Sequence, residues 1–403
     1  MSIRSLRGLQ AAMSLALIGL AFPAFAERYV GPGVTTDEIR LGQTMPYSGP
    51  LSAYGAIGRA QAAYFRKLND AGGINGRKIR LISLDDGYTP GKTVEHARRL
   101  VEHDDVLMVF SSVGTATNLA VRKYYNVKKI PHVFTAGGDA AWSEPGIYPW
   151  TIGWMPSFRK EARLYGMHIL QTRPAARIAV LHSNDDYGKE YLAGLKDGLG
   201  NRASEMIVAT QSFEWADPTV DTQIVSLKAS GADTLFTATA GKQASQALRK
   251  VGEIGWRPAH YTAVPASSPS AILQPAGLEK AVGMITAYYA KDPSATNLQS
   301  DAAVRDYWAW ARKYYEGDAA DNIAAYGYQV AQAIEHVLRA CGEDLSREGI
   351  MRAVTNLRDV ELPMLLPGVK VNTSRTDYSP IEQFIYMRFD GKEWVPFGPV
   401  VSP

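Results

Sequence analysis

Short apolar runs alternate with amphipathic segments from residue 38 to residue 134. The first pair is a strand pattern at 39–43 followed by a helix pattern at 55–71. The later members of this series are strands expected at 79–84, 106–110 and 132–134 and helices expected at 92–102 and 117–125. Repeated strand–helix units with short connections are typical of a parallel sheet covered by helices on both faces.

The same alternation begins again at residue 158, which indicates a second unit of similar build. The pattern predicts helices at 158–171, 189–199, 221–229 and 242–254 and strands at 177–181, 206–210, 234–238, 261–264 and 282–287. Each of the two units is more than 100 residues long, which is enough to enclose a core of its own.

The C-terminal third has a different pattern. Three helices are expected in succession at 301–315, 322–340 and 347–357, and they have no strands between them. A β-hairpin follows, in which we expect Asp390-Gly391 to form a two-residue turn. Because the three helices cannot build a further parallel sheet, we expect them to pack on the earlier units, so that the chain crosses between lobes more than once.

The first 26 residues have the composition of a secretory signal. Arg4 and Arg7 precede an apolar run at 9–20, and Ala24-Phe25-Ala26 forms a cleavage pattern. The alternative is an N-terminal membrane anchor, but the run is shorter than the ~20 residues that a spanning helix needs. We therefore expect a signal peptide at 1–26, an exported periplasmic product and no membrane insertion after cleavage.

Composition and charge narrow the class of protein further. The chain has 403 residues and a formal net charge of +3, and removing the signal brings the mature chain close to neutral. This charge is too weak and dispersed to indicate a nucleic-acid partner. A single cysteine, Cys341, excludes an internal disulfide framework and a metal site made only of thiolates.

The sequence contains no convincing catalytic motif. The segment 86–93 resembles a phosphate-binding loop but is one residue too short, and Pro90 removes one of its backbone donors. Ser157 and Lys160 have the spacing of an acylating pair, yet the Lys-Thr-Gly partner of that motif is missing. The histidines show no metal-ligand spacing, so we expect neither an enzyme nor a bound metal or cofactor.

Hydroxyl residues and glycines gather where the expected strands end. In the first unit these loops are 44–50, 111–117 and 135–138, and in the second they are 184–188, 239–241 and 265–268. Ligands of parallel sheets bind at this edge, and helix starts with free N–H groups suit a carboxylate. The alternative is ordinary helix capping by Ser and Thr. An exported protein with two such units facing each other fits a solute receptor.

Several motifs occur in the order found in one known family. They are Ser48-Gly49-Pro50, Tyr54-Gly55, Leu68-Asn69, the run Ala71-Gly72-Gly73-Ile74-Asn75-Gly76-Arg77, Asp85-Asp86, the run Asn184-Asp185-Asp186-Tyr187-Gly188-Lys189, and Ser230-Gly231-Ala232-Asp233. With these motifs the mature chain resembles the periplasmic solute-binding proteins of branched-chain amino acid ABC transporters, the leucine/isoleucine/valine-binding protein family.

The resemblance implies an α/β fold of the type I binding-protein kind, with two Rossmann-like lobes whose parallel central sheets are joined by a three-strand hinge. Lobe 1 is expected to comprise 36–153 plus 287–366, and lobe 2 to comprise 154–286 plus 367–403. The implied partners are a small carboxylate ligand and the membrane permease of an ABC transporter, and the implied state is a monomer. A periplasmic sensing subunit with the same fold is the alternative.

The resemblance also implies ligand-binding residues. Ser112 or its neighbours, with Thr135 and Gly137, are expected to hold the carboxylate, while Tyr54 and Tyr187 wall the cleft from opposite lobes. The full set of candidate residues is Tyr47, Tyr54, Ser111, Ser112, Thr115, Thr135, Ala136, Gly137, Asp185, Tyr187, Thr239 and Pro265.

One departure from the family pattern concerns the ligand's amine. The family pairs an α-ammonium with an acidic residue near the loop that here reads 263–268, and this loop contains no carboxylate. An unpaired buried ammonium costs several kcal/mol. Either Asp139, Asp185 or Asp186 replaces that acid, or the ligand is an amine-free acid stacked between tyrosines and Trp154 or Phe158. Amides and urea-like solutes are the remaining alternative.

Overall fold

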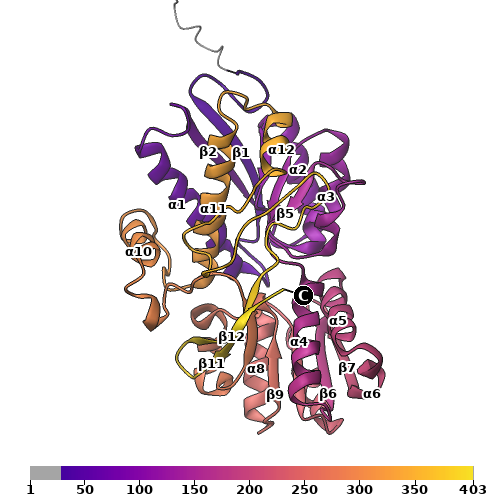
Figure 1. The fold of residues 1–403 in the computed structure, drawn as a ribbon. Helices are drawn as coiled ribbons and strands as arrows, with labels where there is room; N and C mark the ends of the chain where they lie inside the picture. The colour runs from indigo at the N-terminus through magenta and orange to yellow at the C-terminus, as the bar shows by residue number, and fades with distance from the viewer. Residues whose placement is uncertain (1–28, 403) are drawn as a thin grey trace, which may run out of the picture.

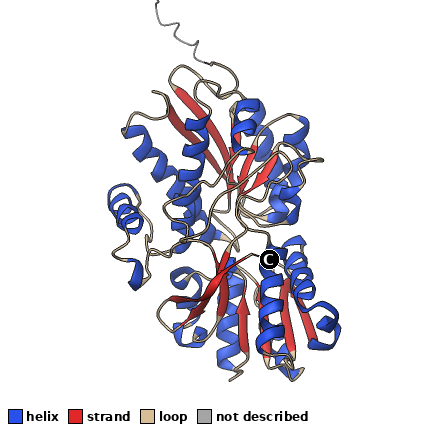
Figure 2. Ribbon diagram, in the orientation of Figure 1, coloured by secondary structure: helices blue, strands red, loops and turns tan. Residues whose placement is uncertain are grey.

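The computed structural model describes residues 29–402, which form two α/β lobes stacked end to end (Figure 1). The predicted signal at 1–26 lies outside the described residues. In each lobe a central sheet is enclosed by helices, as Figure 2 shows. The predicted fold class of two lobes with parallel central sheets is therefore confirmed.

The first lobe contains a five-stranded sheet of order β2-β1-β3-β4-β5, in which all neighbours are parallel. Its strands are β1 (Glu38–Met45), β2 (Lys78–Asp85), β3 (Met108–Phe110), β4 (His132–Thr135) and β5 (Thr151–Gly153). Its helices are α1 (Gly55–Asp70), α2 (Pro90–Arg98), α3 (Thr115–Val127), α10 (Ala302–Tyr314), α11 (Asn322–Ala340) and α12 (Arg347–Val354). Helix α11 lies against α1, where a Cβ on Gly327 would come within 2.6 Å of the Ile57 carbonyl oxygen.

The second lobe contains a seven-stranded sheet of order β12-β11-β10-β9-β8-β6-β7. Its strands are β6 (Ile178–Ser183), β7 (Ile207–Phe213), β8 (Thr234–Ala238), β9 (Ala259–Thr262), β10 (Ile285–Tyr288), β11 (Phe384–Phe389) and β12 (Trp394–Val401). Its helices are α4 (Phe158–Thr172), α5 (Asp186–Leu199), α6 (Ala203–Met206), α7 (Asp221–Ala229), α8 (Gly241–Glu253) and α9 (Gln274–Ala276). Strand β11 pairs antiparallel with both β10 and β12, so this sheet is parallel except at the edge formed by the C-terminal hairpin.

The chain passes between the lobes after β5, after β10 and before β11, because the C-terminal hairpin joins the second sheet while α11 packs on α1. Side-chain contacts strengthen this junction. The Tyr378 hydroxyl donates to the Pro149 carbonyl at 3.0 Å, and the Lys160 ammonium pairs with Glu382. The C-terminal segments therefore hold both lobes together, as the succession of helices predicts.

Three local expectations were wrong. The hairpin has a four-residue loop and not a two-residue turn, because Phe389 pairs with Trp394 and the Asp390 carboxylate accepts the backbone N–H groups of residues 392 and 393. Strand β10 begins at Ile285 and not at 282, because Gly283 has a φ of +86° that interrupts extended backbone. The three-residue strand β5 was not expected at all, since it is too short to show a period.

Helices α4 and α5 pack on each other through glycines. A Cβ on Gly194 would lie 2.2 Å from the Arg159 carbonyl oxygen, and one on Gly198 would lie 2.1 Å from that of Arg163. Both distances are far below van der Waals contact, and both neighbours are backbone atoms that cannot rotate away. This approach sets the spacing of the two helices that cover one face of the second sheet.

We therefore expect Gly194→Ala to destabilise the protein by about 1–3 kcal/mol, the usual effect of overpacking. The measurement is urea-induced unfolding followed by circular dichroism. Gly91→Ala is the control, because a Cβ there meets nothing within 4 Å and alanine favours the helix. Equal effects of the two substitutions would contradict the close-packing account.

Candidate functional site

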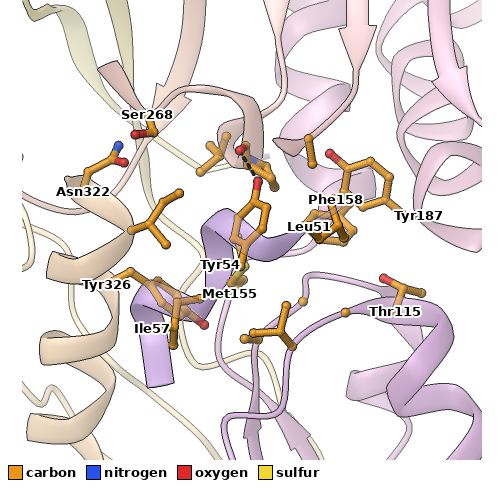
Figure 3. A pocket seen from close by; sticks show the side chains of 18 of the residues that line it. Leu51, Tyr54, Ile57, Thr115, Met155, Phe158, Tyr187, Ser268, Asn322 and Tyr326 are labelled. Carbon is orange, nitrogen blue, oxygen red and sulfur yellow. Dashed lines mark hydrogen bonds between the residues drawn. The ribbon is translucent and has the colours of Figure 1, made fainter. Parts of the chain in front are cut away.

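A cavity lies between the two lobes, and the empty space in and around it, open solvent included, is about 760 Å³ (Figure 3). The lining residues are Leu51, Tyr54, Ile57, Tyr88, Val113, Gly114, Thr115, Ala136, Gly137, Met155, Phe158, Tyr187, Trp215, Ala240, Val264, Pro265, Ser268, Tyr288, Tyr289, Asn322, Ile323 and Tyr326. Many of them follow the carboxyl ends of β1, β3, β4, β8 and β9, the edge where the sequence predicts a ligand.

The lining is aromatic and uncharged. Eight of these side chains are Tyr, Phe or Trp, and most of the others are aliphatic. Among the described residues that line the cavity, none is Asp, Glu, Lys, Arg or His. The lining therefore favours a ligand with an apolar body, and no side chain of the lining itself carries a countercharge for an ammonium group.

The two lobes touch across the cavity. The Tyr54 hydroxyl of the first lobe donates to the Pro265 carbonyl of the second at 2.5 Å. Burial raises the pKa of Tyr54, so its hydroxyl stays neutral and able to donate. The rings of Tyr88 and Trp215 also meet edge to face at 5.8 Å between centroids. The lobes are thus closed over the cavity.

The N-terminus of α3 forms one end of the cavity. Its N-cap is Gly114, which has no side chain to occupy the first N–H groups of the helix. Thr115 is only 2% exposed, and its buried hydroxyl has no hydrogen-bond partner among the described residues. The Tyr88 ring also lies here, since a Cβ on Gly114 would come within 2.2 Å of it. The Thr115 hydroxyl and the positive helix end together favour an anion at this end.

Six of the twelve candidate residues line the cavity: Tyr54, Thr115, Ala136, Gly137, Tyr187 and Pro265. They come from both lobes, and Tyr54 and Tyr187 stand on opposite lobes as expected. Their contact with a ligand stays a prediction. The other six candidates lie outside the lining.

Tyr47 and Ser111 belong to a chain of hydrogen bonds inside the first lobe. The Tyr47 hydroxyl lies 2.7 Å from the Ser83 hydroxyl, which in turn donates to Gln43. Gln43 donates to Gln61, and Gln61 donates to the Ser111 hydroxyl at 2.8 Å. The polar groups of Tyr47 and Ser111 are therefore used to join β1, β2 and α1 in the lobe itself.

Ser112 and Thr135 also serve the backbone of the first lobe. The Ser112 hydroxyl accepts the Thr44 N–H at 3.0 Å. Thr135 is fully buried, its carbonyl accepts the N–H of Gly137, and its hydroxyl has no hydrogen-bond partner among the described residues. Each of the two residues directly precedes a lining residue, Val113 or Ala136, and their contact with a ligand stays a prediction.

Asp185 and Thr239 lie behind the wall of the second lobe. The Asp185 carboxylate caps α5 and accepts the Trp215 indole N–H at 2.7 Å. The Thr239 carbonyl accepts the Tyr187 hydroxyl at 2.9 Å. Each residue thus orients an aromatic ring of the lining. Asp139 and Asp186, the other acids considered for an ammonium, are likewise absent from the lining.

Sequence reasoning missed most of the aromatic wall, including Tyr88, Trp215, Tyr288, Tyr289 and Tyr326. One signal was available. Asn322 and Tyr326 are four residues apart and so share a face at the start of α11, which follows an N-capping Asp321. Phe158 lines the cavity as suggested, whereas Trp154 is buried beside Phe134 and does not.

Two α/β lobes closed over a cavity at the carboxyl ends of their strands define a bilobed ligand-binding receptor. The chain belongs to the periplasmic binding protein family, whose sequence model matches residues 38–393. This family consists of extracytoplasmic solute-binding receptors rather than enzymes, in agreement with the expected lack of catalysis. The resemblance to the branched-chain amino acid type is confirmed.

Two curated relatives are similar in sequence. The chain is 25% identical to an amino acid binding protein of Pseudomonas aeruginosa over 54% of this chain and 58% of that relative. It is 23% identical to a Leu/Ile/Val-binding protein homolog 1 of Brucella abortus over 78% of this chain and 82% of that one.

Two solved structures share the fold. A branched chain amino acid ABC transporter protein from Thermus thermophilus with bound valine superposes with a TM-score of 0.81 at 16% identity, over 92% of this chain and 98% of that chain. A solute binding protein from R. palustris in complex with benzoate gives 0.75 at 18% identity, over 90% and 97%.

Two further properties concern the described part of the chain. None of its helices has the length and hydropathy of a membrane span. Within the same residues, His, Cys, Asp and Glu form no group of three placed to hold a metal ion.

A buried carboxyl group supports the cavity wall from behind. Glu161, at the start of α4, accepts the Val264 N–H at 2.9 Å and the hydroxyls of Tyr165 and Tyr191. Burial raises the pKa of Glu161 to about 7 despite these three donors. Since Val264 lines the cavity, Glu161 fixes part of the ligand loop to α4.

This pKa makes the free energy of unfolding depend on pH. Below pH ~4.5 Glu161 is protonated in both the folded and unfolded states, whereas between pH ~4.5 and ~7 only the folded state holds the proton. The protein should therefore lose ~3 kcal/mol of stability from this group as pH rises from 4.5 through 7.

Urea unfolding at pH 5 and pH 8 measures this loss. Glu161→Gln cannot titrate, so its stability should fall less than that of the wild type between the two pH values, whatever its absolute stability. The same fall in both proteins would show that Glu161 is ionised throughout this range.

The Tyr54 hydroxyl gives a separate prediction about closure. Tyr54→Phe removes the donor to Pro265 without changing the apolar lining, so the closed state loses a hydrogen bond worth ~1 kcal/mol. We expect ligand affinity to fall about 5-fold, measured by calorimetry. Tyr124→Phe, which removes a hydroxyl bonded to Glu102 within the first lobe, should leave the affinity unchanged.

Proposed function

We propose that this protein is the solute receptor of an ABC importer and closes over a small carboxylate that lacks an amine. The observation that carries the proposal is the uncharged aromatic lining of the cavity. The ligand would have an aromatic or aliphatic body, and the receptor would deliver it to a membrane permease from the periplasm after cleavage of residues 1–26.

The lining argues against an α-amino acid because an ammonium group needs a partner once it leaves water. A buried unpaired cation costs several kcal/mol. The acids behind the wall, Glu161, Asp185 and Asp321, already accept two or three hydrogen bonds each from wall residues and their supports. Turning any of them toward a ligand would release Val264, Trp215 or Ser268.

The carboxylate fits the α3 end of the cavity. The Thr115 hydroxyl has no partner among the described residues, and Gly114 leaves the first N–H groups of α3 without a side-chain cap. A carboxylate there gains hydrogen bonds to a charged acceptor, worth about 1.5–3 kcal/mol each. The rings of Phe158 and Tyr187 lie beside this end and would pack on the body of the ligand (Figure 3).

The structural neighbours agree with both kinds of ligand, since one holds valine and another holds benzoate. The shared fold therefore does not distinguish an amino acid ligand from an amine-free acid. The composition of this chain's own cavity supports the second kind.

A matched pair of ligands tests the proposal. 3-Phenylpropionate and phenylalanine differ only in the α-amine, as do 4-methylpentanoate and leucine. We expect the amine-free member of at least one pair to raise the melting temperature, since ligand at 100-fold above Kd stabilises by about 2.7 kcal/mol. Stronger stabilisation by the amino acid in both pairs would refute the proposal.

A substitution tests where the carboxylate binds. Thr115→Val keeps the shape of the side chain and removes the unpartnered hydroxyl, so affinity for the acid should fall about 10-fold or more by calorimetry. Thr117→Val is the matched control on the same helix, because the Thr117 hydroxyl donates to the Val113 carbonyl and does not line the cavity. Equal losses in the two variants would place the carboxylate elsewhere.

A further inference from the structure

The cavity has a second polar end. In Figure 3, Ser268, Asn322 and Tyr326 lie on one side of the Tyr54 ring, and Phe158, Tyr187 and Thr115 lie on the other. The aliphatic and aromatic side chains between them form an apolar middle. A ligand that holds its carboxylate at Thr115 therefore points its other end toward Asn322 and Tyr326.

Tyr326 has an unsatisfied hydroxyl at this end. The side chain extends from α11 and lines the cavity, and its buried oxygen has no hydrogen-bond partner among residues 29–402. Leaving a buried hydroxyl unpaired is unfavourable, because it loses its hydrogen bonds to water and gains none in return. A ligand group that hydrogen-bonds to Tyr326 would recover this free energy.

Asn322 lies one helical turn before Tyr326, is only 5% exposed and also lines the cavity. Tyr288 lines the same cavity, and burial raises the pKa of its hydroxyl, so that hydroxyl remains neutral. Tyr288 lies close enough to Tyr326 to raise the pKa of that group further. Two phenol hydroxyls and a carboxamide thus gather at this end.

The charge next to this end excludes a second anion. Asp321 caps α11 and accepts both the Ile323 N–H and the Ser268 hydroxyl at 2.9 Å. A carboxylate placed beside it would meet a like charge at low local dielectric, which is unfavourable. A neutral hydroxyl avoids this repulsion and can both donate and accept.

We infer that the preferred ligand carries a hydroxyl at the end opposite its carboxylate, held by Tyr326 and Asn322. This inference rests on the proposed function and narrows its substrate class to hydroxylated acids with an apolar middle. A site built to hydrogen-bond a hydroxyl also discriminates against the analogue that lacks it, because its own polar groups are then left unpaired.

The test compares 4-hydroxybenzoate with benzoate, and 3-(4-hydroxyphenyl)propionate with 3-phenylpropionate, by calorimetry on the mature protein. We expect the wild type to bind the hydroxylated member of at least one pair about 10-fold more tightly. Tyr326→Phe removes only the hydroxyl and should bring that ratio close to 1, mainly by weakening the hydroxylated acid. Asn322→Leu, which retains the volume, should also reduce the ratio.

Tyr124→Phe, which removes a hydroxyl bonded to Glu102 within the first lobe and away from the cavity, is the control for the loss of a tyrosine hydroxyl and should keep the wild-type ratio. A wild-type ratio near 1 in both pairs would overturn the inference, as would a preference that survives both Tyr326→Phe and Asn322→Leu. Failure of the proposed function has a different signature: none of the four acids binds, while an amino acid does.

Discussion

The hydrogen bond from the Tyr54 hydroxyl to the Pro265 carbonyl fixes how the two lobes face each other. Tyr54 stands directly before α1, and Pro265 follows β9, so the bond ties the ligand-facing loop of one sheet to that of the other. Gly241 permits this approach, since a Cβ there would lie 2.9 Å from the Pro50 carbonyl oxygen. The cavity is lined from both lobes because these loops meet at this distance.

Carboxyl groups near the cavity support its wall and do not form its surface. Glu161 holds the Val264 backbone, Asp185 holds the Trp215 indole, and Asp321 holds Ser268. A carboxylate facing an apolar cavity would be desolvated without compensation, whereas one behind the wall collects donors from the wall itself. The same acids therefore give rigidity to an uncharged surface, and selection among ligands depends on hydroxyls, amides and helix ends.

The order of elements could be predicted from the sequence because each has a clear period. Helix α7, strand β8 and helix α11 have the predicted bounds to the residue. The loops of the site were also located, since ligand sites of parallel sheets lie at the carboxyl ends of their strands.

The side chains within those loops could not be assigned in the same way. Ser112 and Thr115 are both small hydroxyl residues of one loop, yet the first hydrogen-bonds to the Thr44 backbone and the second lines the cavity. Only the packing of β1 against β3 decides between them. Tyr326 is still more difficult to predict as a site residue, because it lies on α11, more than 200 residues after the loop of Ser112 and Thr115. No local sequence pattern indicates that the helix and the loop line the same cavity.

The two ends of the cavity differ in how a helix begins there. Helix α3 starts after Gly114 and keeps its first N–H groups without a side-chain cap, so the positive end of its dipole faces the ligand. Helix α11 starts after Asp321, whose carboxylate accepts the Ile323 N–H and cancels the same effect. One residue at the N-cap thus makes one end attractive to an anion and the other suitable for a neutral group. This asymmetry would orient an elongated acid in the cavity with its carboxylate toward α3, independently of the contacts that its apolar middle makes.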